Sequence, residues 1–189
     1  PYRATRLRLE CSDALFFQSS LNPGSFRPLV ELRQLAIEFC KIGNLSEGAF
    51  RGLHNLNDLS QRTHNTDWSS MTLYVHANAF GQDLDKLQRL DLSQNNMWNL
   101  PDGVMCPLRN LDYLNLTKNR ISDVTSFQFS TANRHPTTKC GENIVVMDLS
   151  HNNIESLPAG VFSGLTKLQK IYLHANGLSS IADRVLEGL

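Results

Sequence analysis

One spacing of apolar residues recurs along the chain and constrains its fold more than any other feature. Leu87, Leu90 and Leu92 are followed by Asn95, and the same order returns 24 residues later, starting at Leu111. A leucine pattern with a fixed period of about 20 to 29 residues indicates stacked units, because no unit of that size buries its apolar face alone. The chain is therefore expected to form an elongated solenoid.

The pattern is typical of the leucine-rich repeat. It predicts an α/β solenoid with a curved parallel β-sheet on the concave face and a mostly irregular or short helical convex side. We interpret residues 1–189 as a single domain of about seven repeats, and as an internal fragment that lacks terminal caps. The expected unit starts are Ala4, Leu32, Leu56, Leu87, Leu111, Ile144 and Leu168.

The ninth position of each unit is the second regular feature. A buried asparagine there is expected to bond backbone groups of its own unit and of the neighbouring one. The four later units are regular and the first three are degenerate, with Gln61 also standing where an apolar residue is normal. The residues at the ninth position are Ser12, Cys40, His64, Asn95, Asn119, Asn152 and Asn176.

Charge and composition narrow the classes of partner. The 189 residues contain 18 basic and 18 acidic side chains, so no electrostatic argument favours nucleic acid or a membrane surface, and we expect neither nucleic-acid binding nor direct membrane insertion by this segment. No apolar stretch is long enough to span a bilayer. No catalytic, phosphate-binding or metal-ligand spacing is present, so the chain is interpreted as a non-enzyme without cofactor or metal.

Four cysteines favour an oxidising compartment. Cys106 and Cys140 precede the starts of adjacent units by similar distances, which predicts a disulfide between them, with two free thiols as the alternative. Cys11 and Cys40 lie one position apart in the first two units. They are interpreted either as a second bridge or, for Cys40, as a buried thiol in the asparagine column.

Two glycosylation sequons point to the same compartment. They are Asn44-Leu45-Ser46 and Asn115-Leu116-Thr117. Asn115 occupies an outward strand position, so a glycan there would stand on the concave face. An occupied Asn115 would prevent a partner from lying flat on that part of the sheet.

The outward positions of the expected strands mix both signs of charge with a few aromatic side chains, which suits protein recognition. Tyr113, Tyr172 and His174 are the preferred contacts, because aromatic rings supply contact area at low entropic cost. Asp58, Lys118, Asp148 and Lys170 share this face. The full set of candidate partner-binding residues is Arg33, Glu38, Arg62, Arg89, Asp91, Tyr113, His151, Tyr172 and His174.

Two further features allow more than one interpretation. His151 and His174 lie on adjacent strands, where they form either a pH-sensitive patch or two ordinary exposed histidines. The irregular run from His64 to Ser69 contains Trp68, which either fills the core beside the disrupted strand or contacts a partner.

Three irregular segments carry a family resemblance. They are Cys11-Ser12-Asp13-Ala14-Leu15-Phe16-Phe17, Leu35 through Ile42, and Thr63-His64-Asn65-Thr66-Asp67-Trp68-Ser69. These segments resemble the N-terminal ectodomain of insect Toll receptors, especially the long Tolls such as 18-wheeler. They are more specific than the leucine consensus, which many unrelated extracellular proteins share.

The resemblance implies a type I membrane receptor in innate immunity or development, with its leucine-rich repeats outside the cell and a signalling TIR domain inside. It implies binding of a Spätzle-like cystine-knot cytokine or a cell-surface protein, followed by receptor pairing. The alternative function is cell adhesion or matrix binding without TIR signalling.

Overall fold

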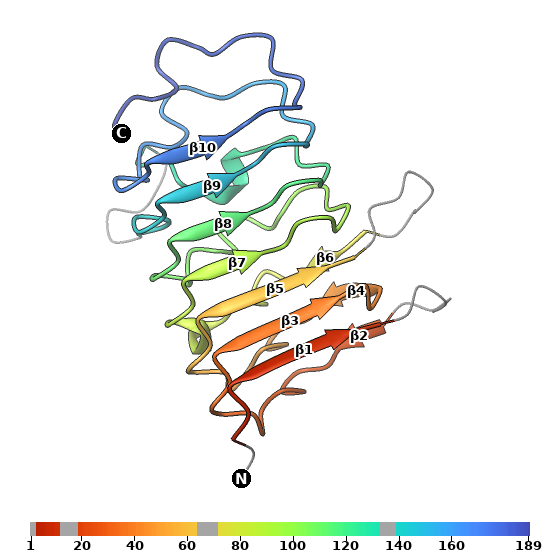
Figure 1. Cartoon of the computed structure of the whole chain (residues 1–189). Coiled ribbons are helices and arrows are strands. Elements are labelled where there is room, and N and C mark those ends of the chain that lie inside the picture. The colour runs from red at the N-terminus through yellow and green to blue at the C-terminus, as the bar shows by residue number, and fades with distance from the viewer. Residues whose placement is uncertain (1–2, 12–18, 64–71, 133–138) are drawn as a thin grey trace.

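Seven parallel strands form one continuous sheet, each contributed by one repeat (Figure 1). The computed structural model describes residues 3–11, 19–63, 72–132 and 139–189. The strands stack in chain order, and each begins two residues after the unit start expected from the leucine pattern. They are β1 (Arg6–Glu10), β3 (Gln34–Glu38), β5 (Asp58–Arg62), β7 (Arg89–Asp91), β8 (Tyr113–Asn115), β9 (Val146–Asp148) and β10 (Lys170–Tyr172). The predicted solenoid is confirmed.

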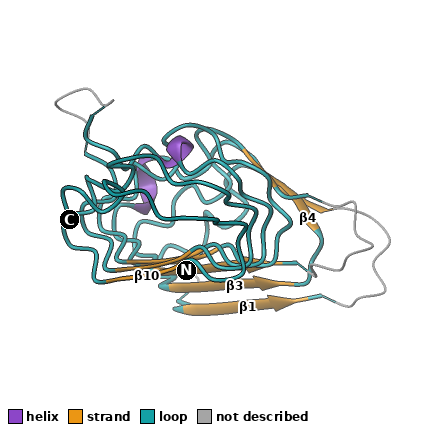
Figure 2. Ribbon diagram, turned by 90° about the horizontal axis from the view of Figure 1, so that it is seen from above, coloured by secondary structure: helices purple, strands orange, loops and turns teal. Residues whose placement is uncertain are grey.

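A second, smaller parallel sheet covers only the first three units. It consists of β2 (Ser19–Leu21), β4 (Ile42–Leu45) and β6 (Tyr74–Val75), paired in that order. The opposite wall of the solenoid is built of turns and loops (Figure 2). Helix within the described residues is limited to two single 3-10 turns, η1 (Gln82–Leu84) and η2 (Thr125–Phe127).

The sheet register places like positions of successive units side by side. Leu35 pairs with Leu59, Leu59 with Leu90, and Leu90 with Leu114, and each of these side chains is at most 1% exposed. Because strand residues alternate between faces, the residues on either side of each leucine point to solvent. The leucine positions therefore fix which side chains the sheet presents to a partner.

A ladder of phenylalanines fills the space behind the sheet in the first units. The rings of Phe26 and Phe50 are 6.3 Å apart with an interplanar angle of 8°, and those of Phe50 and Phe80 are 6.4 Å apart at 6°. All three side chains are buried. Such stacking requires the convex segments to repeat as regularly as the strands do.

In the fourth to seventh units the chain leaves the strand through a left-handed residue just before the ninth position. The φ angle lies between 54° and 59° at Gln94, Lys118, His151 and Ala175. This conformation is unfavourable by about 1–2 kcal/mol for any residue other than glycine. The side chain of the asparagine that follows forms hydrogen bonds to backbone groups of this turn. The repeated strain is therefore offset by side-chain hydrogen bonds, as Asn119 shows.

Asn119 joins its own unit to the preceding one, as predicted. Its Nδ2 donates to the carbonyls of Leu92 and Leu116, both at 3.0 Å. Its Oδ1 accepts from the backbone amides of Asn95 and Met97 at 3.1 and 3.0 Å. Asn152 and Asn176 make the corresponding bonds one and two units further on.

We expect Asn119→Ala to lower the free energy of unfolding by about 3 kcal/mol or more, because it leaves several buried backbone groups unpaired at about 1–3 kcal/mol each. The measurement is chemical denaturation at neutral pH. Asn153→Ala, at an exposed asparagine near the ladder, is the matched control. A loss at Asn119 no larger than at Asn153 would contradict a structural role for the ladder.

Gln61 departs from the repeat pattern at a fully buried position. Its side chain is 0% exposed, and among the described residues neither its Nε2 nor its Oε1 has a hydrogen-bond partner. It pairs across the sheet with Ile37, which is also buried. An unpaired buried amide destabilises a fold by about 1–3 kcal/mol.

Gln61→Leu should therefore raise the free energy of unfolding by about 1–3 kcal/mol, since it restores the apolar residue that the other units carry. Denaturant midpoints of the two proteins test this. Ser60→Ala on the outward side of the same strand controls for changes in strand propensity. A destabilised Gln61→Leu protein would show that the amide has a role in the native state.

Two disulfides link neighbouring units. Cys11 bonds Cys40, with a Cα separation of 4.7 Å, and Cys106 bonds Cys140, with 4.5 Å. For Cys40 the sequence left a bridge and a buried thiol open, and the structure has the bridge. Disulfides are typical of proteins that fold outside the cytosol.

Candidate ligand-binding surface

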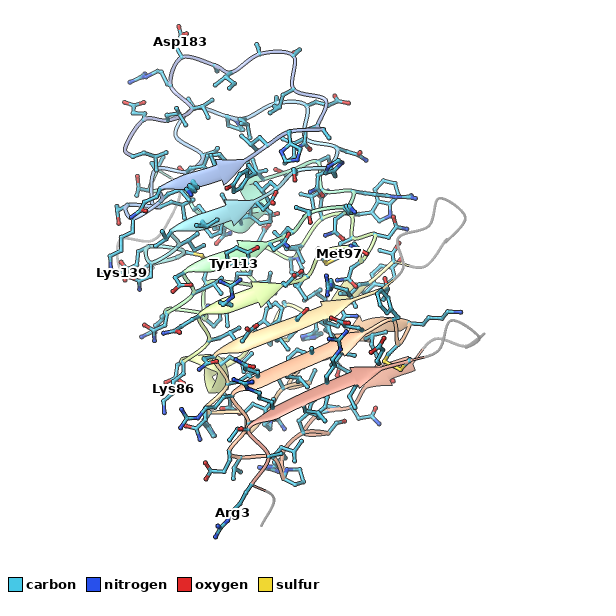
Figure 3. The ribbon with its side chains drawn as sticks, in the orientation of Figure 1. Arg3, Lys86, Met97, Tyr113, Lys139 and Asp183 are labelled. Atoms are coloured by element: carbon cyan, nitrogen blue, oxygen red, sulfur yellow. A yellow bond between two sulfur atoms is a disulfide. The ribbon has the colours of Figure 1, made fainter. Side chains whose placement is uncertain are left out.

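The outward side of the seven-stranded sheet is the candidate surface, and we call it the strand face. Figure 3 shows its side chains, with Tyr113 near the middle. Most of the residues predicted from the sequence lie along it in three groups, and Arg33 is exposed just before β3. The groups are Glu38 with Arg62, then Arg89 with Asp91 and Tyr113, then His151 with His174 and Tyr172.

The first group is an ion-pair cluster on strands β1, β3 and β5. Glu38 Oε2 lies 2.7 Å from Arg8 Nη2, and its Oε1 lies 2.6 Å from Arg62 Nη2. Glu38 is only 6% exposed, whereas the Arg8 side chain is 63% exposed. The prediction of Glu38 as an exposed contact is therefore wrong, because two long arginines from neighbouring units cover it.

The second group lies on β5, β7 and β8. The guanidinium carbon of Arg89 is 4.1 Å from the centre of the Tyr113 ring, and Arg89 Nε is 4.0 Å from Asp58 Oδ2. A guanidinium over an aromatic ring is a favourable contact that also limits the motion of both side chains. This pair presents an ordered cation and a large ring in the centre of the strand face.

Burial and neighbouring charges shift two acids in this group. Burial raises the pKa of Asp58; Arg89 opposes the shift and Asp91 adds to it. Burial likewise raises the pKa of Tyr113, with a further increase from Asp91 that Arg89 partly offsets. Tyr113 therefore stays a neutral hydrogen-bond donor at physiological pH.

In β7, β8 and β9 the side chain of the last strand residue bonds the backbone just beyond the strand. Asp91, Asn115 and Asp148 each accept the backbone amide of the residue two further on, at 2.9 to 3.0 Å. These side chains are half-buried. They can therefore contact a partner only through part of their surface.

The predicted glycosylation residues lie on different surfaces. Asn115 is in the centre of the strand face, where its Oδ1 accepts the Thr117 hydroxyl at 2.9 Å and its Nδ2 lies 3.4 Å from Asp91. Asn44 is exposed on β4 in the second sheet. Occupancy of both sequons stays a prediction.

The third group is at the C-terminal end of the sheet. The rings of His151 and His174 meet edge to face, with centres 5.2 Å apart. Tyr172 lies beside Asp148 in the sheet and is 42% exposed. In the described part of the chain, no set of three histidine, cysteine, aspartate or glutamate side chains is arranged to hold a metal.

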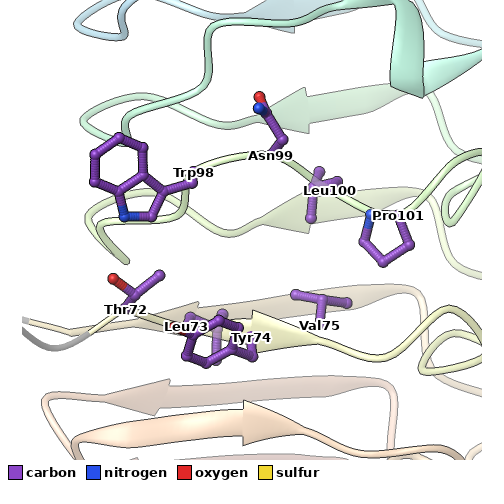
Figure 4. A pocket seen from close by; sticks show the side chains of 8 residues that line it. All are labelled: Thr72, Leu73, Tyr74, Val75, Trp98, Asn99, Leu100 and Pro101. Carbon is purple, nitrogen blue, oxygen red and sulfur yellow. The ribbon is translucent and has the colours of Figure 1, made fainter.

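Sequence reasoning missed a fourth feature, which lies off the strand face between the third and fourth units. A cleft of about 330 Å³ separates residues 72–75 from residues 98–101 (Figure 4). Trp98 is 54% exposed beside it. The corresponding residues of other units are Gly43, Ser122, Glu155 and Ser179, so a tryptophan in a small or polar column was a usable signal.

Some predictions fall outside the described residues. Trp68, and with it the choice between core filler and partner contact, lies in the range 64–71. Much of two segments that carry the family resemblance lies in 12–18 and 64–71 as well. No helix in the described ranges has the length and apolar content needed to cross a membrane.

The pH dependence of stability tests the environment of Asp58. The pKa of Asp58 is raised in the folded state, so the folded protein holds the proton of this carboxyl more tightly than the unfolded chain does. The resulting contribution to stability is complete below the ordinary carboxyl pKa and is lost as pH rises through the folded pKa. The stability of Asp58→Asn relative to wild type should therefore increase between about pH 3.5 and pH 6. Chemical denaturation across that range measures it.

The exposed Glu155 provides the comparison, through Glu155→Gln. The Asp58 difference should change more steeply with pH than the Glu155 difference. A fall in the relative stability of Asp58→Asn as pH rises would mean that the Arg89 ion pair outweighs the burial of the carboxyl.

Comparisons with known proteins agree with this architecture. The Leucine rich repeat family model matches residues 71–121 and 142–189, more than half of the chain. Toll-like receptor 7 of Drosophila melanogaster is 35% identical over 189 residues, which cover 98% of this chain and 13% of the receptor. The chain thus spans a small part of its relative.

Two solved structures share the fold. The Toll–Spatzle complex of Drosophila, in its glycosylated form, superposes with a TM-score of 0.75 at 24% identity, over 97% of this chain and 22% of that one. The TLR13–ssRNA13 complex superposes with a TM-score of 0.66 at 23% identity, over 99% and 27%. Because the second contains RNA, the exclusion of nucleic acid that we drew from net charge is not supported.

Proposed function

Because this chain belongs to the leucine-rich repeat family, as a segment of a Toll-type receptor ectodomain, we propose that its strand face binds a protein ligand of the Spätzle-like cytokine class. Ligand binding would pair two receptors and so activate an intracellular TIR domain. The two disulfides support a place on the extracellular side of the plasma membrane.

The observation that carries this proposal is the stacked pair of Arg89 and Tyr113. Arginine and tyrosine are enriched among the residues that dominate protein interfaces, because they combine large contact area with directed polar groups. Here the pair is pre-ordered at 4.1 Å. Little side-chain entropy would then be lost when a partner covers it.

The charges around the pair favour a protein over a polyanion. Asp58, Asp91 and Asp148 lie on the same stretch of the sheet as Arg89. A phosphate backbone would meet these carboxylates as well as the arginine, with repulsion that offsets the attraction. A protein surface can place groups of both signs against this pattern.

Binding of the complete ectodomain to a Spätzle-like cytokine tests the proposal. We expect Arg89→Ala to weaken binding about tenfold or more, because the change removes a central cation and the support of the Tyr113 ring. Calorimetry or surface binding kinetics measure the affinity. Arg109→Ala, at an exposed arginine outside the strand face, is the matched control.

Equal affinities of the two variants would contradict ligand recognition through the strand face. Aggregation of cells that express the ectodomain, without any response to cytokine, would instead support the adhesion alternative. Because Asn115 lies beside Asp91 and Tyr113, the assay should use both the glycosylated ectodomain and a Thr117→Ala form that lacks the sequon. A glycan at Asn115 is expected to restrict the ligand to one half of the face.

A further inference from the structure

We propose that the cleft between the third and fourth units binds an extended segment of a protein partner. The segment would add to the edge strand β6 and place an apolar side chain in the cleft. The cleft lies off the strand face, between residues 72–75 and 98–101. The proposal therefore concerns a second interaction surface and does not depend on cytokine binding.

The backbone of β6 supplies the first argument. The amide of His76 donates to Leu45 in β4, so even-numbered residues of this strand bond toward the second unit. The amide of Leu73 donates to Asn95, so odd-numbered residues point toward the fourth unit. The N–H and C=O of Val75 therefore face the cleft, as the alternation of a parallel ladder requires.

These groups of Val75 have no hydrogen-bond partner in the described chain. The second sheet ends at β6, because residues 98–101 of the fourth unit do not pair with it. Such an edge presents the donor and acceptor groups that an added strand would bond. In the two preceding units the equivalent edge is already paired within the sheet.

The side chains around the cleft define what kind of segment fits. Leu73, Val75 and Leu100 line it and are at most 8% exposed, so they form an apolar floor. Tyr74 and Trp98 stand on either side and are 71% and 54% exposed. An apolar or aromatic side chain of the partner would be enclosed between these two rings.

Charge favours an acidic segment. The guanidinium carbon of Arg120 lies 5.3 Å from the centre of the Trp98 ring. Among the described residues Arg120 forms no salt bridge, so its charge is available to a partner carboxylate. The proposed ligand of the cleft is therefore an extended peptide with an apolar side chain and a neighbouring aspartate or glutamate.

The probe is a capped synthetic pentapeptide with valine, phenylalanine and valine between two aspartates, titrated into the ¹⁵N-labelled chain. Saturable shifts are expected at the amides of residues 73–75 and at the Trp98 indole. A peptide N-methylated at its central amides should bind about tenfold more weakly, because it cannot complete the ladder. Replacing both aspartates by lysine should also weaken binding.

Protein variants separate recognition from loss of fold. Trp98→Ser should weaken the aspartate peptide about tenfold, whereas Tyr172→Ser, at an exposed aromatic on the strand face, should leave it unchanged. Arg120→Gln should reduce the preference for aspartate over lysine while the Trp98 indole still shifts. Amide spectra of each free variant establish that it is folded.

Three results would overturn the proposal. The first is equal binding of the normal and the N-methylated peptide, and the second is an unchanged affinity of Trp98→Ser. The third is a concentration-dependent shift of the same amides without peptide, which would assign the cleft to a second copy of this chain. None of these results bears on the cytokine assay, because Trp98 and Tyr74 lie outside the strand face.

Discussion

The bond between a buried asparagine side chain and the backbone of the preceding unit is the interaction on which the regular part of the solenoid depends. Each of the four later units leaves its strand through a left-handed residue, which is locally unfavourable. Asn119 stabilises that turn, because its side-chain Nδ2 donates to two backbone carbonyls and its Oδ1 accepts from two backbone amides. The same side chain thus shapes one unit and fixes its distance to the next, so the outward residues of successive strands fall into register.

The first units lack this asparagine and are held together by other means. Cys40 occupies the asparagine position of the second unit and is bonded to Cys11 of the first. A second parallel sheet, β2 with β4 and β6, supplies backbone bonds that the described residues of the later units do not have. The chain therefore combines two ways of stacking: a disulfide and a second sheet at the N-terminal end, and an asparagine ladder from the fourth unit onward.

The sequence predicted the positions of all seven strands, because their spacing follows from leucines that must meet in one core. It did not predict which outward side chains stay accessible. Glu38 looks exposed from its strand position, yet arginines from two neighbouring units cover it. The contact of Arg120 with Trp98 was missed for a related reason. Both depend on how far long side chains reach between units, which a repeat pattern does not specify. The bonding of Cys11 to Cys40 was left open because spacing alone fits a free buried thiol equally well.

The cleft lies at the junction between the units joined by the second sheet and the units joined by the asparagine ladder, and this junction explains why the cleft exists. At this junction Asn95 donates to Gln61 and Leu92 through its Nδ2, but its Oδ1 accepts no bond from the described residues. In the neighbouring strand, the side-chain amide of Gln61 likewise finds no partner in the part of the chain that the structure describes. The second sheet has ended at β6 and the asparagine ladder has only begun, so within the described ranges the backbone of Val75 lacks the strand partner that its equivalents have in the two preceding units. Where the stacking is regular, neighbouring units pair their own backbone or side-chain groups across the corresponding space. The junction instead leaves an edge strand beside two exposed aromatic rings, and this combination can be completed by a strand from another protein.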